Sequence, residues 1–490
     1  MILEVFRKTA NQHQGDLAIV DQGQRITYGD LLDRVNRTHG WLQNRLDVKP
    51  GEVIAASLGN SWQFVASFFA VSDLGGVFMP CNPQWRAEEL RRVAGRSGFR
   101  GVITEPQFRA EWDCLGNVIK PESVLTVDAA ASSSEAAAAL SPFPPQRRSE
   151  DDAAVYLPTS GSTGVPRLVP RTYRNLAVGA RNVARALGIG PGRRFLSVIP
   201  FFHANGFHNC MLMPLLSGAA LVLMRQFSPA ACAELIHRER VDMLIGSPFL
   251  FSLLADSGVD PGCLSTLRCC FSAGARLPSP VHERWRNRFG LRVRQWYGMS
   301  ETSVISIDLT EKESPNGAGT FVGAPIPGVA VRSLAPDGSD LDAGAVGELA
   351  VRSEAVMPGY VDEPRLNEQV FHDGFFRTGD LGYVDSSGNL YLTGRMRRVV
   401  NMSGVKVDPV EVEQAVEALS GVSECHVDAV PNGRDGKVIR ARIVVRQGHQ
   451  ITRRDVIEQC RERLAEYKLP RVVEFVESLP TTITGKMPIP

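Results

Sequence analysis

The chain has 490 residues, of which 43% are hydrophobic and 22% are charged, a balance typical of globular proteins. This length exceeds what a single hydrophobic core usually holds and favours one large and one smaller domain. The 54 Lys and Arg residues almost balance the 53 Asp and Glu residues, for a net charge of +1, which argues against a nucleic-acid partner because such a partner requires a basic excess or stripe.

The first part of the chain alternates β-like runs with helical stretches. Helices are predicted at Gln24–Gln43 (after a turn), Ser61–Asp73 and Arg86–Gly98, and strands at Val53–Ser57, Gly101–Thr104 and Ser123–Val127. A second passage of the same kind runs from Phe195 to Gly298. This alternation predicts an α/β fold with largely parallel sheets, arranged as two α/β subdomains.

The composition changes twice after this passage. Residues 317–394 are rich in Gly, Pro and Asp with short strands, which indicates a small antiparallel β-barrel or sheet. Beyond Gly394 the sequence predicts a smaller α+β domain, with helices at Pro409–Leu419 and Arg453–Tyr467 and strands at Val422–Val430, Arg440–Arg446 and Val472–Phe475. We therefore expect a large domain over residues 1–393 and a mobile small domain over residues 394–490.

Cellular location is predicted from the cysteines and the apolar runs. The nine cysteines include no Cys-x-x-Cys pair, which fits a reducing compartment. Glu4 and Arg7 interrupt the first apolar residues, unlike a secretory signal. The most apolar stretch, Met211–Met224, is too short to span a bilayer and is interpreted as core. We expect a cytoplasmic protein without a membrane span.

The sharpest motif is TSGSTGVPR, Thr159–Arg167, which follows a β-like run. Its hydroxyl groups and unobstructed backbone N–H groups suit the oxygens of a polyphosphate. It is not a Walker A loop, because no Gly-Lys-Ser/Thr ends it, and a plain Ser/Gly turn fits the same composition. The candidate phosphate-binding residues are Thr159, Ser160, Gly161, Ser162, Thr163, Gly164 and Arg167.

Four further motifs stand in a fixed order after this loop. They are QWYGMSET (Gln295–Thr302), FFRTGDLG (Phe375–Gly382), LTGRMRRVVNMSG (Leu392–Gly404) and LPTTITGK (Leu479–Lys486). Together with the loop, the set resembles the adenylate-forming superfamily, which includes acyl- and aryl-CoA synthetases, over nearly the whole chain. The resemblance implies that ATP activates a carboxylic acid as an acyl-adenylate, that pyrophosphate leaves, and that a thiol then takes the acyl group.

The resemblance also implies a nucleotide site. Tyr297, expected at a strand end after Leu291–Gln295, would stack on adenine, and Asp380 would accept from the ribose hydroxyls. Glu301 would hold Mg²⁺, a hard cation that prefers carboxylate oxygen. The cofactor-binding residues implied beyond the phosphate loop are Gly274, Ala275, Arg276, Tyr297, Gly298, Ser300, Asp380, Arg395 and Gly404.

Three residues are expected to act in catalysis or domain motion. Lys486 would offset the negative charge that builds when a carboxylate attacks the α-phosphate, and Arg395 would reach the ribose or α-phosphate. Arg397 occupies the hinge position about which the family rotates its small domain, where Asp or Lys is usual. Arg167 similarly stands where most relatives carry Lys, so charge is kept but geometry differs.

The acid pocket is expected around PFFHANGFHNC, Pro200–Cys210. Two alternatives stay open for His203, a residue that guards the acid or a histidine satisfied at a helix start. The pocket residues implied are His203, Asn205, Asn209, Gly274, Gly298, Val304 and Ile305. The segment has Ala204 where amino-acid-activating relatives place an Asp, which disfavours an α-amino acid, and Gly298 favours an acid larger than acetate. A medium-chain fatty acid and an aryl acid remain, and two asparagines with His208 hint at a polar substituent.

The thiol acceptor is left with two alternatives. Coenzyme A is favoured, and the phosphopantetheine of an acyl carrier protein is the second. Gly404 is expected beside the pantetheine, and the basic residues Lys406, Lys468 and Arg471 are weaker candidates for the phosphates of CoA. A non-catalytic nucleotide sensor is disfavoured because Lys486 is present.

Overall fold

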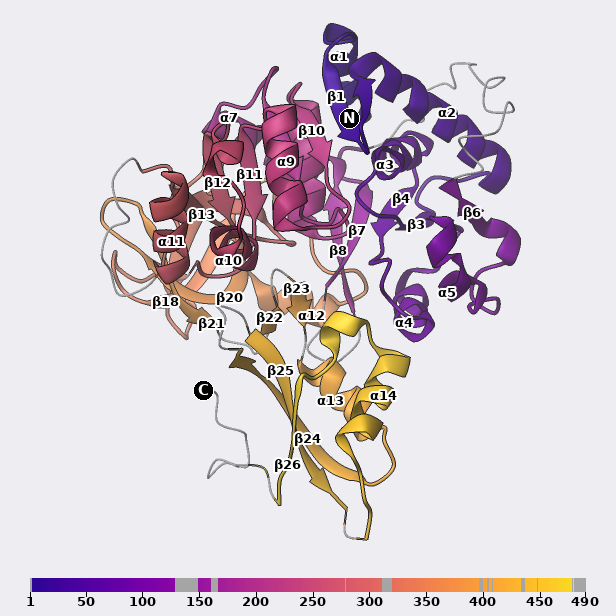
Figure 1. Cartoon of the computed structure of the whole chain (residues 1–490), viewed down its shortest axis with the longest axis vertical. Coiled ribbons are helices and arrows are strands. Elements are labelled where there is room, and N and C mark those ends of the chain that lie inside the picture. Colours follow the sequence, from indigo (N-terminus) through magenta and orange to yellow (C-terminus); the bar gives the residue numbers. More distant parts are fainter. Residues whose placement is uncertain are drawn as a thin grey trace.

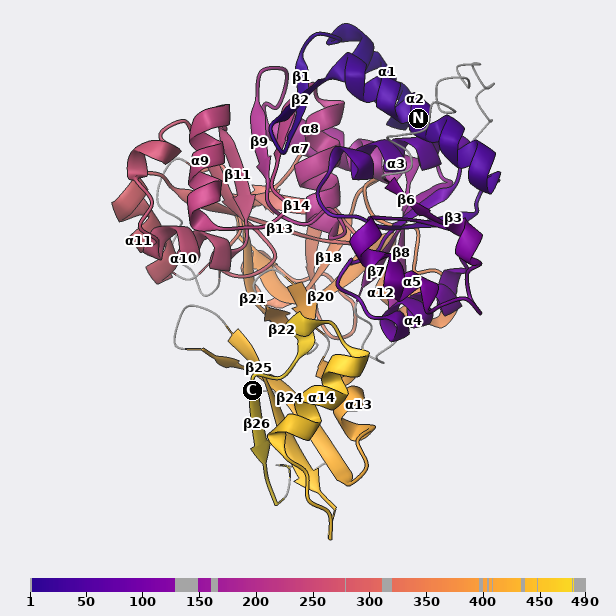
Figure 2. The same cartoon turned by 45° about the vertical axis from the view of Figure 1, so that its right-hand side comes forward.

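The computed structural model describes residues 2–127, 149–159, 166–277, 279–310, 320–395, 400–402, 405–407, 409–432, 437–446, 448–477 and 479. A large body carries a smaller C-terminal unit, coloured yellow in Figure 1, and the two remain distinct when the view is turned (Figures 1 and 2). Among the described helices, none combines the length and the apolar composition that crossing a bilayer requires.

The first α/β subdomain is built on a six-stranded sheet in the order β6-β5-β3-β4-β7-β8. Its strands are β3 (Val53–Ser57), β4 (Val77–Pro80), β5 (Gly101–Thr104), β6 (Val124–Thr126), β7 (Ala153–Thr159) and β8 (Arg167–Thr172). Its helices are α2 (Tyr28–Leu46), α3 (Trp62–Leu74), α4 (Ala87–Ser97) and α5 (Arg109–Asp113). All pairs are parallel except β7–β8, so the predicted βαβ alternation is confirmed here.

The second α/β subdomain contains a nine-stranded sheet in the order β16-β14-β13-β12-β11-β9-β10-β1-β2. Its strands are β1 (Leu17–Asp21), β2 (Gln24–Thr27), β9 (Arg194–Ser197), β10 (Ala220–Leu223), β11 (Met243–Gly246), β12 (Cys269–Ser272), β13 (Val293–Met299), β14 (Ser303–Ile307) and β16 (Ala324–Pro325). The helices of this part are α1 (Ile2–Gln12), α7 (Tyr173–Leu187), the π-helix η4 (Gly206–Leu212), α8 (Met213–Leu216), α9 (Pro229–Glu239), α10 (Pro248–Asp256) and α11 (Ser279–Phe289).

Two sequence predictions need correction in this region. Residues Gln24–Thr27 form strand β2 rather than a turn, and α2 begins only after Thr27, whose hydroxyl accepts from the backbone of Asp30 in a reciprocal capping box. Strand β13 extends to Met299, so Tyr297 lies inside the strand and not at its end. The apolar stretch Met211–Met224 is core, as predicted.

The Gly-, Pro- and Asp-rich region forms a third, antiparallel sheet. It contains β15 (Thr320–Phe321), β17 (Ala330–Leu334), β18 (Gly347–Arg352), β19 (Phe371–His372), β20 (Phe375–Val384) and β21 (Leu390–Arg395), with helix α12 (Pro364–Val370). Of the two predicted alternatives for this region, a small β-barrel or a sheet, the structure shows the sheet. Strands β20 and β21 carry the Asp380 and Arg395 positions opposite each other in register.

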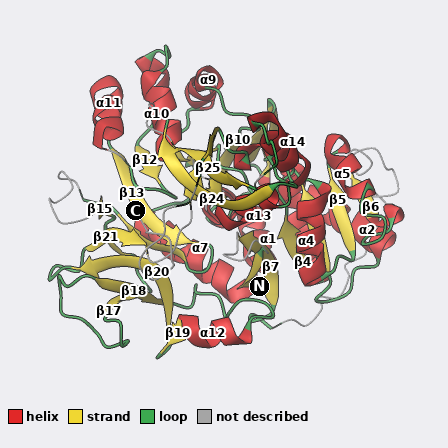
Figure 3. Ribbon diagram, turned by 90° about the horizontal axis from the view of Figure 1, so that it is seen from below, coloured by secondary structure: helices red, strands yellow, loops and turns green. Residues whose placement is uncertain are grey.

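The C-terminal unit has its own hydrophobic core. It consists of β22 (Val400–Met402), β23 (Val405–Val407), α13 (Pro409–Glu417), β24 (Val422–Pro431), β25 (Lys437–Val445), α14 (Arg453–Arg463) and β26 (Val472–Phe475). Residues from Val407 to Leu469 pack into one cluster separate from those of the large body. Seen from below, α13, α14 and β24 lie over the middle of the large body (Figure 3). The separate core favours two domains, and the boundary near Gly394 stays a prediction.

Candidate active site

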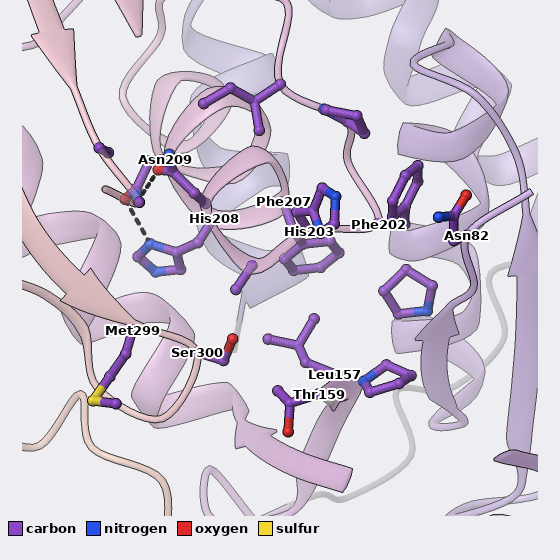
Figure 4. Close-up of a pocket in the computed structure, with 18 of the residues that line it drawn as sticks. Asn82, Leu157, Thr159, Phe202, His203, Phe207, His208, Asn209, Met299 and Ser300 are labelled. Carbon is purple, nitrogen blue, oxygen red and sulfur yellow. Dashed lines mark hydrogen bonds between the residues drawn. The ribbon is translucent and has the colours of Figure 1, made fainter. Parts of the chain in front are cut away.

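A cavity of about 490 Å³ lies where the two α/β subdomains and the C-terminal unit meet. Figure 4 shows Asn82 and Phe202 on one side of it, His208 and Asn209 on the other, and Leu157 and Thr159 at a third edge. The C-terminal unit contributes residues of its own to the lining, so the cavity is completed only when the two domains are together.

The structure brings together six of the seven predicted pocket residues. The predicted residues that line the cavity are His203, Asn205, Asn209, Gly274, Gly298 and Val304. Ile305 is an incorrect prediction, because neighbouring residues of a strand point to opposite faces. Its fully buried side chain packs on the other face of β14, in the cluster that also contains Tyr297.

His203 lies at the start of a helical segment and also lines the cavity, so its two alternatives stay open. Its backbone carbonyl accepts from the amide of Phe207 (2.8 Å) at the start of the helical segment, and its side chain lines the cavity beside Phe202, with ring centroids 4.5 Å apart. Phe207 in turn packs edge-on against Phe68, with centroids 4.9 Å apart. This wall of the cavity is therefore fixed by aromatic packing.

Gly298 is required by the backbone. A Cβ atom at this position would lie 2.3 Å from the carbonyl oxygen of Ser303 and 2.9 Å from Cα of Val304. The register of β13 and β14 shifts at this point. The glycine therefore permits the close approach of two strands, a reason beyond the room for substrate that the sequence suggested.

One side of the cavity is polar. We call Asn205, His208, Asn209 and Ser303 its polar end. His208 Nε2 lies 3.1 Å from the carbonyl oxygen of Leu176, and its Nδ1 lies 3.0 Å from Oδ1 of Asn209 and 3.1 Å from Oγ of Ser303. The side-chain amides of Asn209 and Asn205 are hydrogen-bonded at 2.8 Å.

The charge of His208 is fixed by its surroundings. Burial, together with the positive charge of Arg171, lowers the pKa of His208 to about 4. The ring is therefore neutral near pH 7 and carries a single N–H. The π-helical turn that carries it is a local irregularity often found at functional sites.

The predicted adenine and ribose residues contact each other. The hydroxyl of Tyr297 donates to Oδ2 of Asp380 at 2.6 Å, and both side chains are buried. The backbone amide of Asp380 donates to Oγ1 of Thr378 at 3.1 Å, which holds the turn. Residues more than eighty positions apart are thus in direct contact, and their roles at adenine and ribose stay predictions.

Glu301 lies in a rigid setting. Its Oε1 accepts from the hydroxyl of Tyr360 at 2.9 Å, and its backbone carbonyl accepts from the amide of Met357 at 2.8 Å. The preceding residue, Ser300, lines the cavity, and its carbonyl oxygen accepts from Nη1 of Arg171 at 2.6 Å. The carboxylate is therefore held by Tyr360, and the backbone that carries it is held by Met357 and Arg171.

Arg171 lines the cavity, and the sequence analysis did not predict it. Its side chain is almost fully buried, and Nη2 donates to the carbonyl oxygen of Ala355 at 2.7 Å. Burial lowers the pKa of Arg171 to about 10, with an opposing effect of Glu301, so the guanidinium stays charged. A charged residue within the apolar run of β8 was the signal that could have revealed it.

The phosphate loop is described only at its base. Thr159 and Arg167 face each other at the ends of the antiparallel strands β7 and β8, and Oγ1 of Thr159 donates to the carbonyl of Arg167 at 3.3 Å. The guanidinium of Arg167 lies 5.8 Å from the ring centre of Tyr360. Ser160, Gly161, Ser162, Thr163 and Gly164 lie outside the described residues, as do Arg397, Gly404 and Lys486.

The predicted cofactor-binding residues Gly274, Ala275 and Arg276 follow strand β12. Gly274 has φ of 83°, a conformation that favours glycine, and it lines the cavity. Ala275 and Arg276 follow it at the exposed surface. The backbone of Arg395 ends strand β21 opposite Asp380, and its role near the ribose stays a prediction.

Lys468 was predicted as a candidate contact for the phosphates of CoA, and this prediction is wrong. Its ammonium group is buried and lies 2.7 Å from Oε1 of Glu89, in the large domain, and 2.8 Å from Oε1 of Glu411, in the small domain. The indole of Trp85 also donates to the hydroxyl of Tyr467 at 3.4 Å. We call Glu89, Glu411 and Lys468 the interdomain cluster.

Comparison with known proteins gives a consistent result. Residues 6–361 match the family of AMP-binding enzymes, and residues 411–486 match the AMP-binding enzyme C-terminal domain. A feruloyl-CoA synthase of Amycolatopsis sp is 31% identical over 96% of this chain and 94% of its own.

The solved structures that this chain resembles over 99% of its length include two bound complexes. An o-succinylbenzoate CoA synthetase from Bacillus subtilis, bound with the product analogue OSB-NCoA, has a TM-score of 0.87 with 26% identity over 96% of its length. ATP-bound MatB from Rhodopseudomonas palustris has a TM-score of 0.73 with 27% identity over 97% of its length. The chain belongs to the AMP-binding enzyme family, and it is an AMP-forming acyl-CoA synthetase that uses ATP and coenzyme A.

Proposed function

We propose that the acid activated by this ligase is an aromatic carboxylic acid, converted to its acyl-AMP and then to its CoA thioester. The Phe, Trp and Tyr residues that line the cavity are Trp85, Phe202, Phe207, Phe227, Phe249, Trp296 and Tyr467. Flat rings favour stacked or edge-on contact with an aromatic substrate. The relationship to a feruloyl-CoA synthase supports this class of acid.

The observation that carries the proposal is the polar end in an otherwise largely apolar cavity. Buried amides and an imidazole next to apolar walls are unfavourable unless they are hydrogen-bonded. The terminal methyl group of a fatty acid would offer Asn205 no partner, whereas a ring substituent of an aryl acid can. An aryl acid with a polar substituent therefore fits better than the fatty acid that the sequence left open.

Glu301 fits the role of a magnesium ligand. No cluster of three or more metal-binding side chains occurs among the described residues, which suits Mg²⁺, since this ion is commonly held by one or two carboxylates and by substrate phosphates. Tyr360 and Arg171 hold the Glu301 region in place, and the bound ion would supply neutralisation of phosphate charge. Tyr297 and Asp380 are proposed to bind adenine and ribose.

The pose of the small domain is proposed to be the one that forms the thioester. At nearly equal identity, the chain superposes better on the synthetase bound with a CoA-product analogue than on ATP-bound MatB. Rotating one domain lowers an overall score even where each domain matches. The buried interdomain cluster supports a specific contact in this pose.

The remaining residue roles are proposals drawn from the motifs. Lys486 and Arg395 act on the α-phosphate side, His203 guards the acid, and Arg397 is the pivot between poses. An Arg397→Pro variant should keep acyl-AMP formation and lose thioester formation, since proline restricts backbone rotation. An unchanged thioester-forming step would refute the pivot.

We propose that no carrier protein takes the place of CoA as the acceptor. The named relatives are CoA ligases, and Gly404 and the region around it would border the pantetheine. A carrier protein, unlike CoA, would need an exposed docking face on the enzyme. Comparing thioester formation with CoA and with a phosphopantetheinyl carrier separates the two.

The test of the proposed function is acid-dependent exchange of pyrophosphate into ATP. A panel of benzoic, cinnamic, medium-chain fatty and α-amino acids should show exchange with the aromatic acids, at kcat/KM at least about tenfold above the fatty acids, since one tenfold step corresponds to about 1.4 kcal/mol. Preference for fatty acids would overturn the aromatic assignment. Absence of exchange with every acid would overturn the adenylation of these classes.

A further inference from the structure

A chain of hydrogen bonds runs through the polar end of the cavity, from the backbone carbonyl of Leu176 to Asn205. The donor and the acceptor at each step follow from the first bond. The carbonyl oxygen of Leu176 lies 3.1 Å from Nε2 of His208 and can only accept a hydrogen bond. Since the neutral ring has a single N–H, the favourable tautomer carries it on Nε2. The other ring nitrogen, Nδ1, is then an acceptor.

The position of the ring is held by its neighbours. A Cβ atom at Gly179, on helix α7, would lie 2.9 Å from Nε2 and Cε1 of His208 and 3.1 Å from Oγ of Ser303. The imidazole therefore packs directly against the backbone of α7. His208 is 4% exposed, so the groups that meet Nδ1 are the side chains of Asn209 and Ser303 rather than water.

The tautomer of His208 determines the orientation of the Asn209 side-chain amide. Oδ1 of Asn209 faces Nδ1 at 3.0 Å, an arrangement that sets two acceptors against each other once the proton is on Nε2. Turning the amide of Asn209 by 180° keeps its heavy-atom positions and puts an N–H on Nδ1. Its oxygen then faces Asn205.

The orientation of Asn209 in turn fixes the orientation of the Asn205 amide. This amide lies 2.8 Å from that of Asn209, so it must donate an N–H to the turned amide oxygen of Asn209. Its own carbonyl oxygen becomes the outer end of the chain. Asn205 is half-buried and lines the cavity, where this oxygen can accept from a bound molecule.

We propose that the substrate acid carries a phenolic hydroxyl group on the part of its ring that lies at the polar end of the cavity. The side-chain carbonyl oxygen of Asn205 accepts a hydrogen bond from this hydroxyl. This inference rests on the proposed function and makes the substrate a hydroxylated aromatic acid. Asn205 is the specificity residue, and His208 and Asn209 are positioning residues that fix the orientation of its amide.

The experiment compares three acids that differ at one position: 4-hydroxycinnamic acid, its methyl ether and cinnamic acid, with the corresponding benzoic acids as a second length. The kcat/KM of pyrophosphate exchange should favour the hydroxyl compound over the methyl ether by about tenfold or more in one of the two lengths, because a methyl ether has no proton to donate and leaves the buried oxygen unpaired. Equal values, or a preference for the ether, would overturn the inference while leaving the aromatic function standing.

Matched variants identify the group that makes the distinction. Asn205→Leu, similar in size, should lower the hydroxyl-to-ether ratio to about one, since no acceptor remains. Asn82→Leu, the same change at a lining residue that lies across the cavity from Asn209 in Figure 4, should keep the ratio of the wild type. A ratio compares two acids on one enzyme, so partial loss of folded protein cancels. A ratio retained in Asn205→Leu would overturn the role of Asn205.

Discussion

Replacing Lys486 by alanine should slow acyl-AMP formation by about 10²–10³-fold, because the variant loses a cation that offsets the charge developing at the α-phosphate. Thioester formation from supplied acyl-AMP should be largely retained, since that step contains no attack on phosphorus. Pyrophosphate exchange measures the first half-reaction, and CoA-dependent release of AMP from the acyl-AMP measures the second.

A control for this variant is Lys437→Ala. Lys437 is an exposed lysine at the start of β25 in the same domain, and its loss should leave both half-reactions unchanged. If Lys486→Ala lowers both half-reactions equally, the lysine has a structural role. If it lowers neither, the cation at the α-phosphate must come from elsewhere.

Replacing Lys468 by methionine should have the largest effect on stability. The variant leaves the carboxylates of Glu89 and Glu411 buried without their shared cation, and breaking a buried ion pair in this way costs about 3–5 kcal/mol. Because Glu411 and Lys468 both belong to the small domain, that domain should unfold at a lower temperature. Scanning calorimetry of the full chain measures the shift.

Glu89→Gln isolates the contact between the domains. It removes one charge in the large domain, while the bond between Lys468 and Glu411 stays within the small domain. The small domain should then unfold as in the wild type, whereas thioester formation from supplied acyl-AMP should slow by about 10- to 150-fold, given about 1.5–3 kcal/mol for a hydrogen bond to a charged group. Unchanged thioester formation in this variant would mean that the cluster does not support the productive pose.

The interdomain cluster also shows where reading the sequence alone fails. Glu89 and Lys468 are 379 positions apart, and nothing local distinguishes either from a solvated surface charge. Their pairing depends on how two separately folded units are placed against each other. The same holds for Arg171, whose partners are the backbone carbonyls of Ser300 and Ala355.

The sequence by itself determined the alternation of strands and helices, the order of the nucleotide motifs and the class of reaction, because these depend on local periodicity and on short motifs. Strands β3, β5 and β26 have the predicted ends. Only the tertiary structure decided that Val304 faces the cavity while Ile305 does not, since that choice depends on which face of β14 packs on which core. It also set the direction of hydrogen bonding from Leu176 to Asn205, because a tautomer is fixed by the groups that surround a ring and not by its place in the chain.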